Sequence, residues 1–267
     1  VDPGFRESIF SKLYTTKTTT ADRRFWVPDY MSVLPKLYCS YQTDVEEIMT
    51  MTDYFHSVSR QVGVGLGTSG LSFGLSYGWG KANQIVNFNH SRIASAEALC
   101  VQYQAKLPFI DKMVPFTDDF VGYVTRLAED PTNKEKYWEF IERFGTHVMV
   151  EMEMGAKSIM ESVFTEEHWM MMNSRSRKIG AQASFYMWTA SIMTGTEKKL
   201  QETFEMLRSD VHMSFIGSLP SQDGNFSSWA IKADQNPVPV IYKLAKINKY
   251  VTRDYFPKLN GIEAVAG

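Results

Sequence analysis

The chain has 267 residues, of which 44% are hydrophobic and 22% are charged, a composition typical of a globular protein with a substantial core. Its 28 basic and 30 acidic residues leave a formal net charge of -2, so neither sign is in the excess that would indicate a nucleic-acid partner or a solvating acidic tail. The opening VDPGFRES lacks the zones of a secretory signal peptide, and we expect any targeting segment to lie outside this sequence. No repeat, low-complexity block or linker divides the chain, which predicts a single domain over residues 1–267.

Two cysteines lie in short apolar runs that are typical of strands, Cys39 in KLYCSYQ and Cys100 in ALCVQYQ. Neighbouring strands would bring the two sulfur atoms within bonding distance, which predicts a disulfide. Two buried thiols are the alternative, because neither cysteine lies in a CxxC or metal-type spacing. The sequons at Asn89 and Asn225 are candidate N-glycosylation sites and favour an oxidising secretory compartment, although such triplets also arise by chance.

Residues 62–80, VGVGLGTSGLSFGLSYGWG, carry no charge and alternate large apolar residues with glycine or serine. The large residues fall on even positions up to 66 and on odd positions from 71, with a turn-like triplet between the two runs. One apolar and one small polar face is the pattern of a transmembrane β-strand between lipid and a water-filled lumen. A soluble, half-buried hairpin gives the same pattern and remains the alternative. The predicted lipid-facing residues are Val62, Val64, Leu66, Leu71, Phe73, Leu75, Tyr77 and Trp79, and the predicted lumen-facing residues are Ser72 and Ser76.

Other interpretations of the same segment are unfavourable. Gly65, Gly67 and Gly70 spell the G-x-G-x-x-G dinucleotide fingerprint, but no acidic residue occurs from residue 54 to 96 to bind a ribose. A membrane-spanning helix is disfavoured because each glycine costs about 1 kcal/mol relative to alanine in a helix interior. The five histidines form no metal-binding pattern, and no nucleophile elbow occurs. We therefore expect no catalytic, cofactor-binding or metal-binding residues, no small-molecule substrate and no enzymatic activity.

A helix followed by a strand is predicted in the centre of the chain. In PTNKEKYWEFIERFG the apolar residues recur at helical spacing, Thr132 and Glu135 predict a capping box, and Gly145 stands where the helix would end. The alternation in THVMVEMEMGAKSIMESVF then predicts a strand with one buried face and one wet face that carries its glutamates.

The remaining segments give shorter signals. The spacing of apolar residues predicts helix over residues 44–61 and 239–251, and strands over 91–107 and 210–219. A second alternating segment, KIGAQASFYMWTASIMTG, begins at residue 178. Its predicted lipid-facing residues are Ile179, Phe185 and Met187.

The junction of the central helix and strand carries a motif, FGTHVMVEMEMGA. It resembles the signature of the membrane attack complex/perforin (MACPF) family, which has an aromatic residue, then Gly-Thr-His, then a glycine pair. Ala156 stands in place of the second glycine, and Val148 stands where an aromatic residue is common. The segments VDPGFRESIF, ALCVQYQAKL and IGSLPSQDGNFSSWAIKADQNPVPVIYKL are similar to perforin-like proteins of apicomplexan parasites, and the matches together cover nearly the whole chain. The signature residues matched are Phe144, Gly145, Thr146, His147 and Gly155.

The resemblance implies an α+β fold of the MACPF/CDC superfamily, with a bent four-stranded antiparallel sheet flanked by two helical clusters. In such proteins the clusters refold into transmembrane β-hairpins after a ring or arc of subunits has assembled on a membrane. Residues 54–89 and 173–207 are the candidate membrane-inserting regions, because each is long enough for two spanning strands and a turn. Glycines and β-favouring residues in a soluble-state helix are then an expected compromise between two structures.

The function that the resemblance implies is pore formation. The chain would be secreted through a secretory organelle as a soluble monomer and would permeabilise a target membrane in parasite egress or cell traversal, without cofactor. Its partners would be a lipid membrane and further copies of itself, with no nucleic acid. A non-lytic adhesion or recognition module of the same fold is the alternative, and charges on the predicted lipid faces would favour it. The signature is expected to be structural, with Gly155 giving backbone freedom at a bend, whereas His147 is either a core histidine or has a role in insertion.

Overall fold

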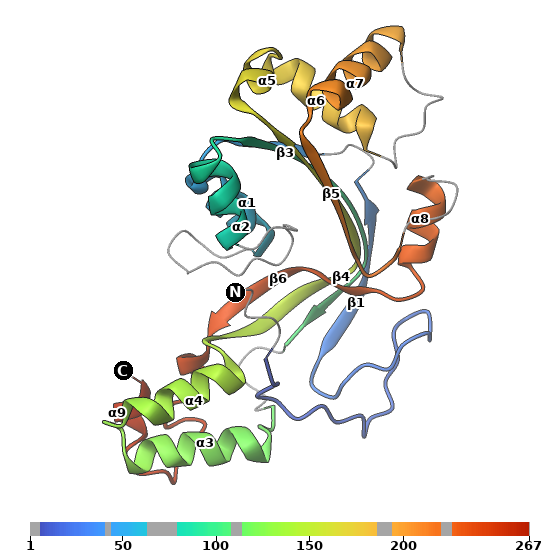
Figure 1. Cartoon of the computed structure of the whole chain (residues 1–267). Coiled ribbons are helices and arrows are strands. Elements are labelled where there is room, and N and C mark those ends of the chain that lie inside the picture. Colours follow the sequence, from blue (N-terminus) through green and yellow to red (C-terminus); the bar gives the residue numbers. More distant parts are fainter. Residues whose placement is uncertain are drawn as a thin grey trace. The chain divides into compact units, whose positions relative to one another are not determined.

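The computed structural model describes residues 6–40, 44–62, 79–107, 114–185, 194–219 and 226–266. Its strands form one sheet of order β1-β3-β4-β5, in which β2 also pairs with β3 and β6 with β4 (Figure 1). This confirms the α+β fold class with an antiparallel sheet, and β2 and β6 add to the expected four-stranded path. The strands are β1 (Ser32–Cys39), β2 (Asp44–Ile48), β3 (Arg92–Lys106), β4 (His147–Phe164), β5 (Asp210–Ile216) and β6 (Val238–Lys246).

The helices lie between the strands in chain order. Those between β2 and β3 are α1 (Met51–Val62), α2 (Trp79–Asn83) and the π-helix η1 (Gln84–Phe88). Those between β3 and β4 are α3 (Asp118–Glu129) and α4 (Lys134–Phe144). Those between β4 and β5 are α5 (Glu166–Met170), α6 (Ser174–Ser184) and α7 (Gly195–Leu207). The last ones are α8 (Phe226–Ala233), η3 (Ile247–Tyr250) and α9 (Ile262–Ala266).

The described chain divides into two compact units. The first unit contains residues 36–104 and 153–241, and the second contains residues 6–35, 105–152 and 242–266. The single domain expected from the sequence stays a prediction.

In the first unit, helices cover both faces of the sheet. Side chains alternate along β3 and β4, so each strand contributes residues to both of these contacts. The face formed by even-numbered residues, here called the even face, packs against α5, α6, α7 and α8. The odd face packs against α1, α2 and η1. The even-face core is Ala94, Ala96, Ala98, Cys100, Ala156, Met160, Phe164, Trp169, Met172, Ala181, Phe185, Phe204, Leu207, Trp229 and Ala233. The odd-face core is Ile48, Tyr54, Ala82, Ile85, Val86, Ile93 and Val163.

This double cover corrects the prediction that β4 has one wet face. Every residue of β4 from Gly155 to Phe164 is buried, on both faces. The acidic side chain of Glu153 is only 14% exposed. Alternation identified the strand correctly, but a sequence pattern does not show that helices from elsewhere in the chain cover the polar face as well.

The second unit has an aromatic core in which α3 and α4 pack with η3 and α9. Phe120 lies at its centre, with ring centroids 5.3 Å from Phe144 and 5.8 Å from Phe140. The helix predicted before Gly145 is present as α4, but its N-cap is Asn133, which accepts hydrogen bonds from the backbone N–H groups of residues 135 and 136. The predicted capping box at Thr132 is therefore wrong.

Two helix predictions are also wrong because sheet pairing decided the structure. Residues 44–48 form β2, with Asp44 opposite Glu97 and Ile48 opposite Ile93 on β3, and the helix begins only at residue 51. Residues 238–246 form β6, which pairs with β4. Valine, isoleucine and tyrosine dominate this segment, and such residues fit a pleated surface better than a helix.

The structure contains the disulfide expected between Cys39 and Cys100, with 2.01 Å between the sulfur atoms. It links β1 to β3, next to a backbone hydrogen bond from Ser40 N to Leu99 O. The cross-link closes a loop with a sequence separation of 61 residues.

Candidate functional site

Two long segments leave the sheet at one end and return to it there. Residues 49–91 connect β2 to β3, and residues 165–209 connect β4 to β5 (Figure 1). In each case the strands are antiparallel neighbours, paired up to Ile48 with Ile93 and up to Val163 with Asp210. A segment between such strands can extend both of them as one hairpin without rearranging the sheet. The predicted regions 54–89 and 173–207 lie within these two segments.

The first segment packs on the odd face through the buried side chains of α1, α2 and η1. Tyr54 of α1 is 2% exposed and Ala82 of α2 is fully buried. Residue Val62 ends α1 and Trp79 begins α2, so these two predicted lipid-facing positions have helical backbone. Phe88 at the end of η1 is 73% exposed. The other predicted positions of this segment lie outside the described residues, namely Val64, Leu66, Leu71, Ser72, Phe73, Leu75, Ser76 and Tyr77.

The second segment packs on the even face, with α6 and α7 side by side (Figure 1). Gly180 of α6 permits this approach, because a Cβ atom there would lie 2.6 Å from the Cβ of Phe204 on α7. Among the predicted lipid-facing residues, Ile179 is half-buried in α6 and Phe185 is 1% exposed in the even-face core. Met187 lies outside the described residues.

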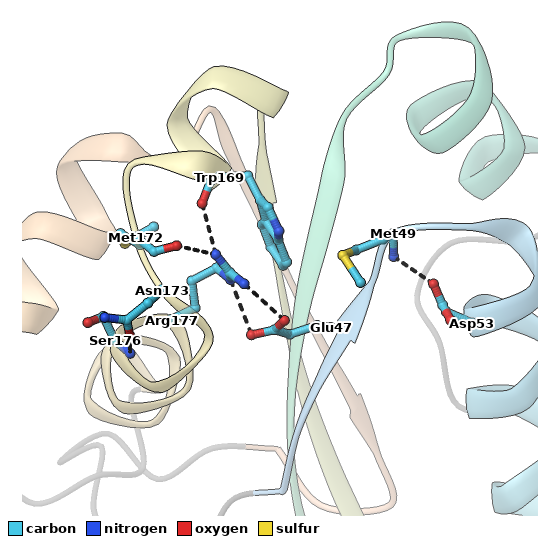
Figure 2. A network of polar contacts seen from close by, with 8 residues as sticks. All are labelled: Glu47, Met49, Asp53, Trp169, Met172, Asn173, Ser176 and Arg177. Carbon is cyan, nitrogen blue, oxygen red and sulfur yellow. Dashed lines mark hydrogen bonds and ion pairs between the residues drawn. The ribbon is translucent and has the colours of Figure 1, made fainter.

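A buried arginine joins α6 to β2. The guanidinium of Arg177 forms a two-pronged ion pair with Glu47, with 3.1 Å for both Nε to Oε1 and Nη2 to Oε2 (Figure 2). Its Nη1 donates to the backbone carbonyls of Trp169, at 2.9 Å, and Met172. The guanidinium carbon also lies 4.2 Å from the centre of the Trp169 ring. Arg177 is 8% exposed, so this group, here called the Glu47–Arg177 clamp, is largely shielded from water.

The clamp lies beside a polar pocket of about 530 Å³. The pocket brings together residues of β2, of α1 in the first segment and of α6 in the second. Its lining residues are Val45, Glu46, Glu47, Asp53, His56, Ser174 and Lys178.

Charged residues also occur on the odd face of the sheet. Lys157 on β4 is 1% exposed and lies 2.8 Å from Glu97 on β3. Glu153 accepts from Lys36 at 2.5 Å and from the hydroxyl of Tyr38 at 2.8 Å. Burial and the Glu153 carboxylate raise the pKa of Tyr38 above its ordinary value. Each of these charges has a partner of opposite charge, and the attraction offsets part of the cost of removing the charges from water.

The signature residues lie where α4 passes into β4. Gly145 ends α4 with φ +75, a conformation that favours glycine, and its N–H donates to Ile141 O at 2.8 Å. Thr146 O accepts from the backbone N–H of Ile247 at 3.0 Å, and its hydroxyl lies 2.9 Å from Nδ1 of His147. Burial, with a smaller contribution from Lys246, lowers the pKa of His147. The hydrogen bonds of Gly145 and Thr146 thus join the end of α4 and the start of β4 to the residue that begins η3.

Gly155 has a different reason to be glycine. A Cβ atom there would lie 1.9 Å from Cys100 O on β3 and 2.9 Å from the Cα of Val101. The backbone of β4 at Gly155 thus lies directly against the backbone of β3 at the residue that forms the disulfide. Ala156, at the position of the second glycine of the signature, is fully buried in the even-face core, which leaves room for its methyl group.

Other candidate sites can be placed briefly. Asn89 is exposed at the end of η1, and Asn225 lies outside the described residues. Within the described ranges, no group of three histidine, cysteine, aspartate or glutamate side chains is arranged to hold a metal ion. No helix in the part of the chain that the structure describes has the length and apolar character needed to cross a bilayer.

The sequence pattern did not single out the clamp. Glu47 and Arg177 are 130 residues apart, and each is an ordinary charged residue in its own segment. The one sequence feature that could have indicated the clamp is Arg177 itself. It is a long charged side chain in a helix whose other buried residues are small, namely Gly180, Ala181 and Ala183.

Comparison with known proteins defines the class of protein. The model of the MAC/Perforin domain matches residues 6–264, and the chain belongs to the MAC/Perforin family.

Particular structures are similar at the level of the fold. GNIP1Aa from Chromobacterium piscinae has a TM-score of 0.59 and 15% identity, over 88% of this chain and 48% of that protein. The chain therefore spans about half the length of that protein. Astrotactin-2, a vertebrate-specific perforin-like membrane protein involved in neuronal development, has a TM-score of 0.48 and 14% identity, over 97% of this chain and 89% of the other. A search among curated proteins finds no match.

Proposed function

We propose that this protein forms pores, by assembling into a ring or arc on a membrane and inserting residues 54–89 and 173–207 as β-hairpins. The observation that carries this proposal is the position of both segments, each between antiparallel neighbours at the same end of the sheet. Extension of both segments would lengthen four strands in register with the existing sheet. Membership of the MAC/Perforin family supports the same activity.

The free energy for insertion would come from two sources. Apolar faces of the hairpins would leave water for lipid, at roughly 25 cal/mol per Å² of apolar surface. Closure of the barrel would satisfy every backbone N–H and C=O group between neighbouring strands, which the bilayer core requires. Each spanning strand needs roughly 9 to 11 residues, and both segments are long enough for two.

The alternation along residues 62–80 specifies which side chains would contact lipid. The lipid-facing positions would be Val62, Val64, Leu66, Leu71, Phe73, Leu75, Tyr77 and Trp79, joined by Ile179, Phe185 and Met187 in the second hairpin. Ser72 and Ser76 would face the lumen. Phe185, now buried among the helices of the even-face core, would exchange that environment for lipid.

The partners that follow from this proposal are a lipid membrane and further copies of the chain. The disulfide supports maturation in an oxidising secretory compartment, followed by release as a monomer. The sequence segments that are similar to apicomplexan perforin-like proteins extend the proposal to membrane lysis in parasite egress or cell traversal.

Dye release from liposomes, combined with electron microscopy of the same liposomes, tests the proposal. We expect release of an encapsulated dye together with rings or arcs on the membrane. Rings without release would instead support a non-lytic adhesion or recognition module of the same fold. Bound protein that forms neither rings nor leaks would contradict pore formation.

A further inference from the structure

The Glu47–Arg177 clamp connects the two candidate membrane-inserting regions. Arg177 belongs to α6 in the second region, and Glu47 lies one residue before the end of β2, the strand that leads to the first region. Glu47 is opposite Ala94 on β3, so its side chain lies on the even face, where α6 packs. The clamp therefore joins a helix of one region to the base of the other.

The base of the first region is short and firmly fixed. Asp53 in the first turn of α1 accepts a hydrogen bond from the backbone N–H of Met49 at 3.1 Å (Figure 2). It also accepts one from the backbone N–H of Thr50 at 2.8 Å. Only three residues separate Glu47 from Met51, the first residue of α1. If α6 leaves the even face, the Glu47 carboxylate loses its partner and the end of β2, from which α1 begins, is weakened.

The clamp tolerates little displacement. The guanidinium of Arg177 forms a bidentate ion pair with Glu47 while its Nη1 donates to two backbone carbonyls. Only the planar guanidinium of arginine can make this set of hydrogen bonds. Glu47 is 14% exposed and Arg177 10% exposed at the side chain, so removing either leaves a largely buried charge without its partner. Loss of α6 from the even face therefore destabilises the end of β2, and loosening of the end of β2 weakens the hold on α6.

We propose that the clamp couples the two regions, so that opening of α1 at the end of β2 and opening of α5 and α6 on the even face favour one another. This inference rests on the proposed pore-forming function for its purpose, since both hairpins must enter one barrel. The coupling itself is a property of the chain in solution. It is reciprocal, because each opening must change the equilibrium of the other by the same factor.

Hydrogen–deuterium exchange of the full chain in solution, without membrane, measures this coupling. In Arg177→Lys and in Glu47→Gln, we expect amide exchange about a hundredfold faster in residues 166–184 and also in residues 51–57. Residues 118–144 of the second unit are expected to exchange as in the wild type. Acceleration confined to residues 166–184, acceleration in all three segments, or no acceleration would overturn the coupling.

Two further variants sharpen the result. Glu166→Gln is the matched control, because it removes an ion pair between α5 and Arg92 of β3 whose glutamate is 60% exposed, and it is expected to change exchange by less than about fivefold. Asp53→Ala is the reciprocal test, because it loosens α1 without touching Arg177. It is expected to accelerate exchange in residues 166–184, and an unchanged rate there would contradict the coupling.

Dye release from liposomes separates this inference from the proposed function. If the wild type releases dye, the two clamp variants are expected to do so after a shorter lag than Glu166→Gln. If no variant and no wild-type sample releases dye, pore formation fails while the exchange rates in solution still decide whether the clamp couples the regions.

Discussion

At the scale of single residues, two glycines mark places where the fold leaves no room for a side chain. Gly155 faces the carbonyl oxygen of Cys100, and Gly180 faces Phe204. The two cases differ in what blocks the added atom. At Gly180 the nearest atom is the Cβ of Phe204 at 2.6 Å, whereas at Gly155 it is a backbone carbonyl oxygen of the sheet at 1.9 Å. Of the two positions, Gly155 is therefore the one where a methyl group is less tolerated.

Gly155→Ala is expected to lower the free energy of unfolding by about 3 kcal/mol or more, because its Cβ would overlap the backbone of β3. Urea unfolding followed by circular dichroism measures the change. Gly122→Ala in α3 is the control, since no atom lies within 4 Å of a Cβ there, and it is expected to stabilise by up to about 1 kcal/mol. A Gly155→Ala protein as stable as the wild type would show that the close approach is not a constraint.

At the scale of elements, the second region combines a tight helix pair with a sequence that alternates like a strand. Phe204 of α7 is fully buried, and its ring centroid lies 4.8 Å from that of Phe164 on β4. The helical state thus depends on packing against the sheet more than on the helix propensity of α6, whose Gly180 disfavours a helix. A region with weak local preference and strong tertiary contacts is suited to adopting a second structure.

Phe204→Ala is expected to destabilise the protein by about 3 to 5 kcal/mol, because it leaves a cavity between α7, α6 and β4. Met206→Ala is the control, because Met206 lies two positions further along α7 and its side chain is 75% exposed. This substitution is expected to change the free energy of unfolding by at most about 0.5 kcal/mol. Thermal unfolding of the two variants side by side provides the measurement. Equal melting temperatures would mean that the α6 and α7 pair does not hold the region in its helical state.

The proposed first hairpin gives a matched pair of variants at adjacent positions. Leu75→Arg would place a charge on the lipid face, at about 2 to 4 kcal/mol per subunit near the bilayer centre, whereas Ser76→Arg would place it in the lumen. Leu75→Arg is expected to abolish dye release and Ser76→Arg to retain it, provided that both bind liposomes. Environment-sensitive fluorophores at residues 71 to 77 are expected to report lipid at every second position. Uniform aqueous signals during active release would contradict the hairpin assignment.

At the scale of the whole molecule, the disulfide is the covalent constraint on a chain whose regions are proposed to change structure. It joins β1 to β3 within the sheet and touches neither of the two segments between strand ends. The sheet can therefore remain cross-linked while α1 and α5 to α7 move. This separation places the covalent bond in the part of the fold that the proposed conversion leaves intact.

Replacing Cys39 and Cys100 by alanine is expected to lower the free energy of unfolding by about 4 kcal/mol on the chain-entropy model, because the unfolded chain regains a loop of roughly sixty residues. Urea unfolding of the double variant and the wild type measures this difference. Mass spectrometry of the non-reduced wild type is expected to detect no free thiol. Two free thiols in the non-reduced protein would contradict the bond.

Local sequence patterns were sufficient to identify the elements whose local pattern and tertiary role agree. The spacing of apolar residues before Gly145 identified α4, and the apolar runs around Cys100 and after residue 210 identified β3 and β5. The signature residues from Phe144 to Gly155 indicated the family that the MAC/Perforin domain match shows. In each of these cases neighbours in sequence supply the structural information.

The features that join distant segments could be identified only from the contacts formed in the folded chain. Residues 44–48 and 238–246 became strands because β3 and β4 offered edges to pair with, against a helical spacing. The polar face of β4 became buried because helices from other segments cover it. The Glu47–Arg177 clamp arose because folding brings residues 130 positions apart into contact. Pairing, burial and charge compensation across the fold depend on which segments meet, and a local pattern carries no record of its partner.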